Sequence, residues 1–194
     1  SEKGNIVSIG TYDTPTTARG VVLSHDEKTA FVPDRSYQLQ IIDVNDPTHP
    51  SLLSTFDTYG AAVDVALSPD GNTLHIVDWF LLINVDVSDP ANPELLGYVN
   101  TQYDNSEAFI GGYSDSLVIS SDGQIAYVES TEYGLVIVDI SDLTAPTVMS
   151  SLNLGIPNSS GNSSKLTLSP DGKSVFFAGD TIGLMIVDVS NPIN

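Results

Sequence analysis

The chain has 194 residues, of which 41% are hydrophobic and 16% charged, a composition that can bury a core in one domain and argues against intrinsic disorder. Six basic residues against 25 acidic ones give a net charge of −19, which makes nucleic acid and anionic membranes poor partners. The absence of cysteine excludes disulfides and thiol chemistry, and no apolar run reaches the roughly 18 residues of a membrane-spanning helix.

In chain order, the sequence predicts short strands that recur. A first strand over residues 5–12 has copies at 51–56 and 93–99. A second apolar segment, at 20–24, returns at 64–68, 116–120 and 165–169, and a third, at 30–32, returns at 74–77, 126–128 and 175–178. Nothing helical of useful length is expected.

The second and third segments are joined by a Ser-Pro-Asp-Gly turn, seen in full at 68–71 and 169–172. Proline suits the second position of a type I turn, and glycine supplies the left-handed conformation of a short hairpin. The first copy departs from this pattern, because His25, Asp26, Glu27 and Lys28 stand in its place.

The strongest pattern is an apolar sequence motif that contains an aspartate after its apolar run, which we call the apolar word. It lies at 134–141, with copies at 40–44, 83–88 and 184–190. Its Val and Ile do not alternate with polar residues, which predicts a strand buried on both faces. The terminal aspartate is expected to cap the next turn by accepting a hydrogen bond from an amide two residues on. A calcium loop at 43–47 is rejected, because Pro47 stands where such a loop needs glycine.

The aspartates of this word, Asp43, Asp86, Asp139 and Asp188, are 43, 53 and 49 residues apart. This spacing is close to the ~40–50-residue period of four-stranded propeller blades. We therefore predict an all-β fold, a β-propeller of four four-stranded blades in one domain over 1–194, with repeats at about 4–50, 51–93, 94–146 and 147–194. The N-terminal strand is expected to close the ring, with Ile6, Val7 and Ile9 pairing alongside Met185, Ile186 and Val187.

The Leu-Val-Ile-Val-Asp word, the Ser-Pro-Asp-Gly turn and the Asp-Val-Ser-Asp/Asn-Pro exit together resemble the LVIVD-repeat β-propeller family, which is related to the Tyr-Val-Thr-Asn propellers. The resemblance covers nearly the whole chain. It implies an extracellular or cell-surface prokaryotic protein, in which the repeat word is structural and not catalytic.

Catalytic motifs are scarce. A Ser-His-Asp set needs convergent groups, whereas repeat position places His25 and His49 in turns and His75 inside a buried strand. Structural roles are the expected ones for these histidines.

Asp64 and Lys165 occupy equivalent places at the start of the innermost strand, so we expect an ion pair at the mouth of the axial tunnel. A cation site there is the rival interpretation, but one carboxylate makes a poor cage.

The loops of the opposite rim vary in length while the Asp-Pro turns repeat, which favours them as a recognition surface. Aromatic side chains beside carboxylates and arginines suit a protein or glycan partner. Solvated loops of an aspartate-rich chain also present such residues without any ligand, and both interpretations stay open. The candidate binding residues are Tyr12, Arg19, Arg35, Trp79, Tyr103, Glu107, Glu129 and Tyr133.

The function predicted from the sequence is therefore an extracellular or cell-surface binding or scaffolding propeller without catalytic activity, needing no cofactor, although calcium is possible. Two alternatives remain. One is a structural subunit of a cation-bridged, self-assembling surface layer or filament. The other is a metal-dependent hydrolase or lactonase that uses the axial mouth.

Overall fold

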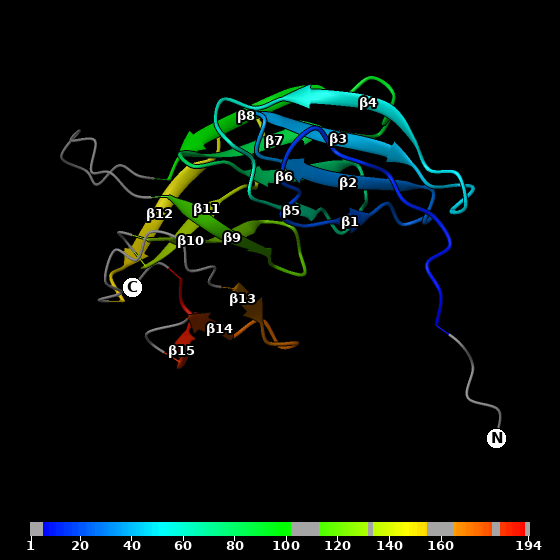
Figure 1. Cartoon of the computed structure of the whole chain (residues 1–194). Coiled ribbons are helices and arrows are strands. Elements are labelled where there is room, and N and C mark those ends of the chain that lie inside the picture. Colours follow the sequence, from blue (N-terminus) through cyan, green and yellow to red (C-terminus); the bar gives the residue numbers. More distant parts are fainter. Residues whose placement is uncertain (1–5, 102–112, 132–133, 155–164, 180–182, 193–194) are drawn as a thin grey trace.

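Four antiparallel sheets follow one another along the chain (Figure 1). The computed structural model describes residues 6–101, 113–131, 134–154, 165–179 and 183–192. All secondary-structure elements in these ranges are β-strands. None of the described residues forms a helix long and apolar enough to cross a membrane. The all-β prediction is confirmed.

Each sheet is a meander in which neighbours in sequence pair antiparallel. The first contains β1 (Val22–Leu23), β2 (Thr29–Asp34), β3 (Gln38–Asp43) and β4 (Ser51–Asp57), and the second contains β5 (Asp64–Leu67), β6 (Thr73–Val77), β7 (Leu81–Asp86) and β8 (Glu94–Asn100). The third contains β9 (Ser114–Ile119), β10 (Ile125–Ser130), β11 (Gly134–Asp139) and β12 (Thr147–Leu152), and the fourth contains β13 (Lys165–Leu168), β14 (Ser174–Gly179) and β15 (Gly183–Asp188). We call these sheets blades 1 to 4.

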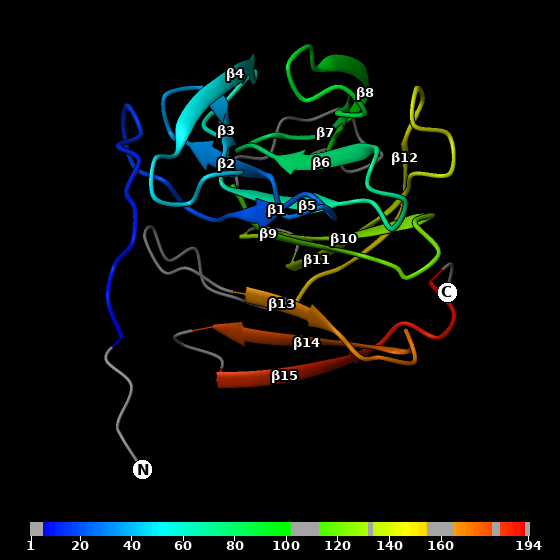
Figure 2. The same cartoon turned by 90° about the vertical axis from the view of Figure 1, so that its right-hand side faces the viewer.

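The blades stack face to face, with their first strands side by side (Figure 2). Contacts run from β1 to β5, from β5 to β9 and from β9 to β13. A hydrophobic cluster fills each junction: Phe31 and Ile76 belong to the first, Val77 and Val128 to the second, and Ile137 and Phe177 to the third. Burial between blades is the reason that the apolar words do not alternate.

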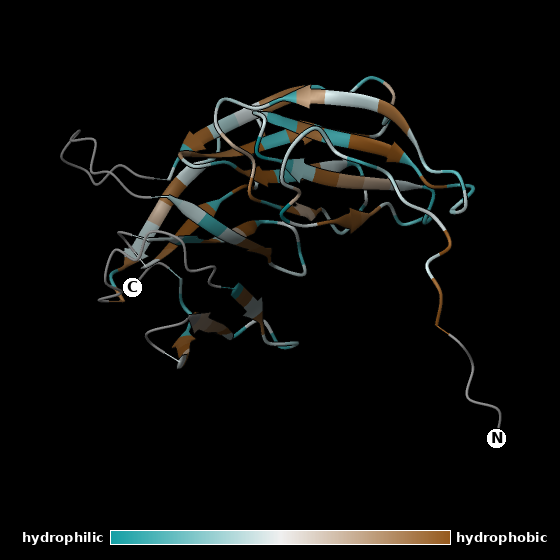
Figure 3. Ribbon diagram, in the orientation of Figure 1, coloured by the Kyte–Doolittle hydropathy of each residue, from teal (hydrophilic) through white to brown (hydrophobic). Residues whose placement is uncertain are grey.

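The apolar words form the third strand of each blade. Hydropathy falls from these mainly hydrophobic strands to the more hydrophilic turns that follow them (Figure 3). Leu82, Ile83 and Val85 on β7 are fully buried, as a strand covered on both faces requires. On β15, by contrast, Leu184 is 66% and Ile186 is 58% exposed. The face of blade 4 that carries Leu184 and Ile186 is exposed to solvent, because within the described residues blade 4 packs against blade 3 only.

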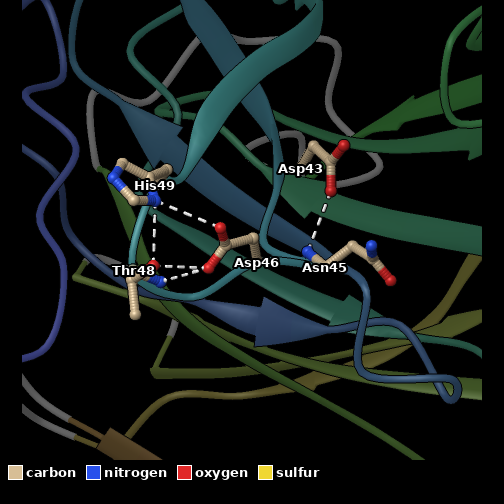
Figure 4. Close-up of polar contacts among 5 residues, drawn as sticks. All are labelled: Asp43, Asn45, Asp46, Thr48 and His49. Atoms are coloured by element: carbon tan, nitrogen blue, oxygen red, sulfur yellow. Dashed lines mark hydrogen bonds and ion pairs between the residues drawn. The ribbon is translucent and has the colours of Figure 1, made fainter.

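The aspartate at the end of each word caps its turn as predicted. Asp43 Oδ1 accepts a hydrogen bond from the Asn45 amide at 2.9 Å (Figure 4), and the equivalent bonds in the other blades measure 2.8–2.9 Å. A second turn follows, in which Asp46 accepts from Thr48 and contacts His49 Nδ1 at 3.1 Å. These bonds lower the pKa of Asp46 to about 2, with the Thr48 hydroxyl as the largest cause.

The hairpin turns also repeat one bonding pattern. In blade 2 the Ser68 hydroxyl donates to Asp70 at 2.5 Å and accepts from the Thr73 amide at 2.9 Å. Gly71 has φ +78°, the left-handed conformation predicted for this position. In blade 1 the same conformation is taken by Glu27, at φ 59°, so the departure in sequence leaves the turn geometry intact.

The predicted closure of the ring is wrong. Within the described residues β15 pairs only with β14, blade 4 has three strands, and Ile6 is fully exposed. The N-terminal segment instead runs along blade 1, where Tyr12 packs against Ala30, Val32 and Ile42 (Figure 1). Within the described residues no blade packs against the outer face of blade 1, so burial of its apolar surface under Tyr12 is favourable. The expected strand over 5–12 is accordingly absent from its described part, residues 6–12.

Candidate functional site

The loops that enter the first and third strands meet at one edge of the stacked blades, which we call the loop rim. Arg35, between β2 and β3, places its guanidinium 5.9 Å from the ring centre of Trp79, between β6 and β7. Trp79 in turn contacts Tyr113, just before β9, with ring centres 5.1 Å apart and planes at 61°. Three blades therefore contribute to one group of a cation and two aromatic rings, in which the rings meet edge to face; we call it the stack.

Asp115, on β9 and two residues after Tyr113, is near enough to Arg35 to be affected by its charge. Burial is the largest influence on the carboxyl and raises its pKa, while the charges of Arg19, Arg35 and Lys165 act in the opposite direction. These three residues are half of the six basic residues in the chain. Half of the cations of a strongly acidic protein thus act electrostatically on one carboxylate.

The axial mouth adjoins Asp115 and is tied together by Asp64. One carboxylate oxygen of Asp64 accepts from Ser116 Oγ at 3.1 Å, from the Leu117 amide at 3.2 Å and from Lys165 Nζ at 3.1 Å. The predicted ion pair between Asp64 and Lys165 is confirmed, and it joins blade 2 to blade 4. Ser116 Oγ also accepts from the Leu166 amide at 3.2 Å, which extends the connection through blade 3.

Two buried aspartates shape the loops behind the stack. Asp78 Oδ1 accepts from the amides of Phe80 and Leu81 at 2.8 and 2.7 Å, and burial raises its pKa. Asp34 accepts from the Ser36 amide at 2.8 Å and from both the amide and the hydroxyl of Thr16. Each aspartate therefore fixes the loop that carries Trp79 or Arg35, so both are positioning residues.

The structure brings together only part of the predicted recognition set. Arg35 and Trp79 contact each other at the loop rim, and Arg19 acts on the nearby Asp115. Tyr12, by contrast, packs on the outer face of blade 1, and Glu129 is 1% exposed within β10. The remaining predicted residues, Tyr103, Glu107 and Tyr133, lie outside the described residues.

Sequence reasoning missed Tyr113 and Asp115. Both lie within three residues of Ser116, the residue of β9 equivalent to Asp64 and Lys165, and this proximity was the signal that could have found them. A metal centre has no support among the described residues, where no group of three or more His, Asp or Glu side chains is suited to hold an ion.

Stacked four-stranded meanders with their first strands around a common axis define the blades of a β-propeller. The LVIVD repeat model matches this chain at residues 17–58, 59–101, 111–153 and 161–194. The chain therefore belongs to the LVIVD-repeat family, and the resemblance seen in the sequence is confirmed. A comparison with curated proteins finds no match.

Solved structures support the same fold. A Lactobacillus plantarum protein superimposes with TM-score 0.75 at 16% identity, covering 92% of this chain and 54% of that one. A proposed 6-phosphogluconolactonase from Bacteroides fragilis gives 0.67 at 16% identity over 89% of this chain and 53% of its own. The Cps50 (Swd1) β-propeller domain of Myceliophteria thermophila gives 0.67 at 12% identity, with coverage of 89% and 54%. The chain thus spans about half the length of the structures it matches.

Proposed function

We propose that this chain is a non-catalytic binding module, and that its loop rim recognises a glycan. The observation that carries the proposal is the contact of Arg35 with Trp79 and of Trp79 with Tyr113, next to a carboxylate, Asp115, that is near enough to be affected by the charges of Arg19, Arg35 and Lys165. The chain as a whole carries a net charge of −19, and at this edge charges of both signs and aromatic rings occur together.

A glycan suits this combination of groups. Guanidinium groups donate and carboxylates accept several hydrogen bonds each, which matches the donor and acceptor character of sugar hydroxyls. Aromatic rings offer a flat apolar surface of limited conformational freedom to the C–H face of a sugar. Tyr113 is 49% exposed, and Arg35 is also exposed, so both are accessible to a ligand.

The proposal includes a location outside the cell or at the surface of a prokaryotic cell. It is supported by the properties expected of LVIVD-repeat proteins and by a surface charge that suits cation-rich surroundings. The proposed module needs no cofactor for binding. Calcium would enter only as a counterion of its aspartates.

A glycan array probed with the intact chain and with the variants Arg35→Ala and Tyr113→Ala tests this function. Binding that both variants weaken at least tenfold, or about 1.4 kcal/mol, supports it. Tyr98→Ala is the matched control, because Tyr98 is an exposed aromatic (52%) on the outer strand β8, where it contacts Tyr59 at 5.3 Å. Binding of a protein but of no glycan, or equal losses in all three variants, would reject the glycan proposal.

Hydrolysis at the axial mouth is the second candidate. It is favoured by two matched structures described as proposed 6-phosphogluconolactonases, at 16% identity each. Against it, Asp64 is already bonded to Ser116, Leu117 and Lys165. Lactone hydrolysis that depends on added divalent cation and is abolished by Asp64→Asn would establish this function.

The cation-bridged assembly is tested by sedimentation, where a sedimentation coefficient unchanged by millimolar calcium counts against it.

A further inference from the structure

The junctions between blades share one contact at the turn that follows each apolar word. In each junction a small residue on the fourth strand of one blade lies against this turn of the next blade. The Ser54 hydroxyl donates to the Pro90 carbonyl at 2.6 Å, and the Ser150 hydroxyl donates to the Pro192 carbonyl at 2.7 Å. Gly97 takes this place on β8, where a Cβ would lie 2.6 Å from a carbonyl oxygen in the turn of blade 3.

The N-terminal segment makes the same contact on blade 1. A Cβ on Gly10 would overlap the carbonyl oxygen of Pro47, which belongs to the Asp-Pro turn of blade 1. Two residues later, Tyr12 packs against the apolar residues of that blade. Phe56 and Val99 follow the small residues of β4 and β8 by the same two positions, and both pack into the junction with the next blade. The segment therefore occupies the place of a fourth strand in a blade that would precede blade 1.

Blade 4 has the complementary gap at the other end of the stack. Within the described residues β15 pairs with β14 only, so no fourth strand follows it. Leu184 stands four residues before the aspartate of its word, and Leu39 and Leu135, at the same position of blades 1 and 3, are fully buried. Ile186 likewise corresponds to the fully buried Ile41. The exposed face of blade 4 thus carries the side chains with which a blade covers its successor.

The outer face of blade 1 shows what it lacks by the exposure of its first strand. Val21 stands three residues before the hairpin serine and is 65% exposed. Val65, Leu117 and Leu166, at the same position of blades 2 to 4, are buried against the preceding blade. Blade 1 therefore has the fourth strand of a preceding blade without the other three, and blade 4 has three strands without the fourth.

We propose that two copies of this chain join head to tail into a closed ring of eight blades, in which the N-terminal segment of each copy completes blade 4 of the other. The pairing of β4, β8 and β12 with the strand before each places Gly10 opposite Ile186, and Tyr12 opposite Leu184, across the two copies. Backbone pairing would cover the open edge of β15. Two copies of four blades fall within the ~4–8 blades of most propellers, and one copy spans about half of the structures it matches.

Sedimentation equilibrium of the intact chain tests the ring, in EDTA and at high salt to screen the repulsion between two copies of charge −19. The expected result is twice the mass of one chain. Ile186→Glu and Val21→Glu place a charge in the two open faces, at positions exposed in one chain, and should weaken association at least tenfold. Leu95→Glu, at an exposed position of β8 away from both ends, is the matched control and should leave the mass unchanged.

Three other outcomes would overturn the proposal. A monomer at every concentration would show that the two faces do not meet. Masses that grow beyond the dimer would show an open head-to-tail chain, which forms when the rotation between copies does not close. A dimer that appears only with calcium and is absent in EDTA would assign the association to cation bridging.

Disulfide cross-linking tests the register, because the chain contains no cysteine. Ser8 is expected opposite Val187 of the other copy, as Leu52 lies opposite Ile42 in blade 1. A mixture of the Ser8→Cys chain with the Val187→Cys chain should form a covalent dimer on mild oxidation, whereas either variant alone should not. No cross-link in the mixture, or equal cross-linking in all three samples, would reject this strand pairing. The pairing does not depend on glycan binding at the loop rim.

Discussion

The two edges of the blade stack differ in how strictly they repeat. At the edge of the hairpin and Asp-Pro turns, which we call the turn rim, a serine hydroxyl bonds an aspartate two residues on in every blade, at 2.5–2.7 Å. At the loop rim each blade contributes a different group, such as Arg35, Trp79, Asp115 or Lys165. Repetition marks what every blade needs in order to form. Groups that only one blade has are therefore the candidates for function.

Glycines at equivalent positions give the sharpest test of what a neighbouring chain segment requires. Gly134 and Gly183 start β11 and β15 with φ +76° and +67°. A Cβ on Gly134 would lie 2.5 Å from the Leu152 carbonyl oxygen, whereas one on Gly183 meets nothing within 4 Å. We expect Gly134→Ala to cost about 3–5 kcal/mol by adding backbone overlap to left-handed strain, and Gly183→Ala only about 1–2 kcal/mol.

Urea unfolding of both glycine variants measures the difference. Equal losses of unfolding free energy would mean that the close approach of Leu152 to Gly134 does not restrain blade 3.

Acid should weaken the turn rim next. The turn aspartates have lowered pKa values, with Asp46 at about 2 against an ordinary 3.8. A lowered pKa in the folded state contributes stability above pH 3.8, and this contribution is lost as pH falls towards 2. Asp78 and Asp115 act in the opposite sense, because burial raises their pKa values and acid relieves that cost.

Because the turn aspartates outnumber these two, we expect the melting temperature to fall between pH 3.8 and about 2. Calorimetry across that range checks the sign, and a melting temperature that rises on acidification would contradict it.

A single turn serine should matter by a smaller amount. The Ser120 hydroxyl donates to Asp122 at 2.6 Å and accepts from the amides of Gln124 and Ile125 at 3.2 and 2.9 Å, so Ser120→Ala removes all three bonds. We expect a loss of about 1–2 kcal/mol. The exposed neighbour Ser121 is the control, and Ser121→Ala should stay within about 0.5 kcal/mol of wild type in the same unfolding experiment.

The hairpin turn of blade 1, which lacks the glycine of the other three blades, should become more stable when glycine is introduced. Glu27 holds φ 59°, where blades 2 to 4 have glycine. A non-glycine residue in this conformation is strained by about 1–2 kcal/mol, which glycine relieves at some entropic cost, so we expect Glu27→Gly to gain about 0.5–1 kcal/mol. A loss of stability on thermal unfolding would show that the Glu27 side chain makes an interaction worth more than the strain.

The sequence was sufficient to predict the blades, because the apolar words, the Asp caps and the hairpin glycines are local and repeated. It also predicted the pair of Asp64 and Lys165 from their equivalent positions. It failed for the N-terminal segment, because pattern alone could not reveal that the outer face of blade 1 is available to Tyr12. Likewise Asp115 and Tyr113 were missed, since their importance comes from residues of other blades that no local pattern connects.

Hydrogen–deuterium exchange, measured with and without the glycan selected on the array, tests the division between the two rims most directly. We predict slower exchange on binding in the peptides that contain Arg35, Trp79 and Asp115, and unchanged exchange in the hairpin turns at 24–28 and 169–173. Protection confined to those turns, with no change at Arg35, Trp79 and Asp115, would contradict the assignment of recognition to the loop rim.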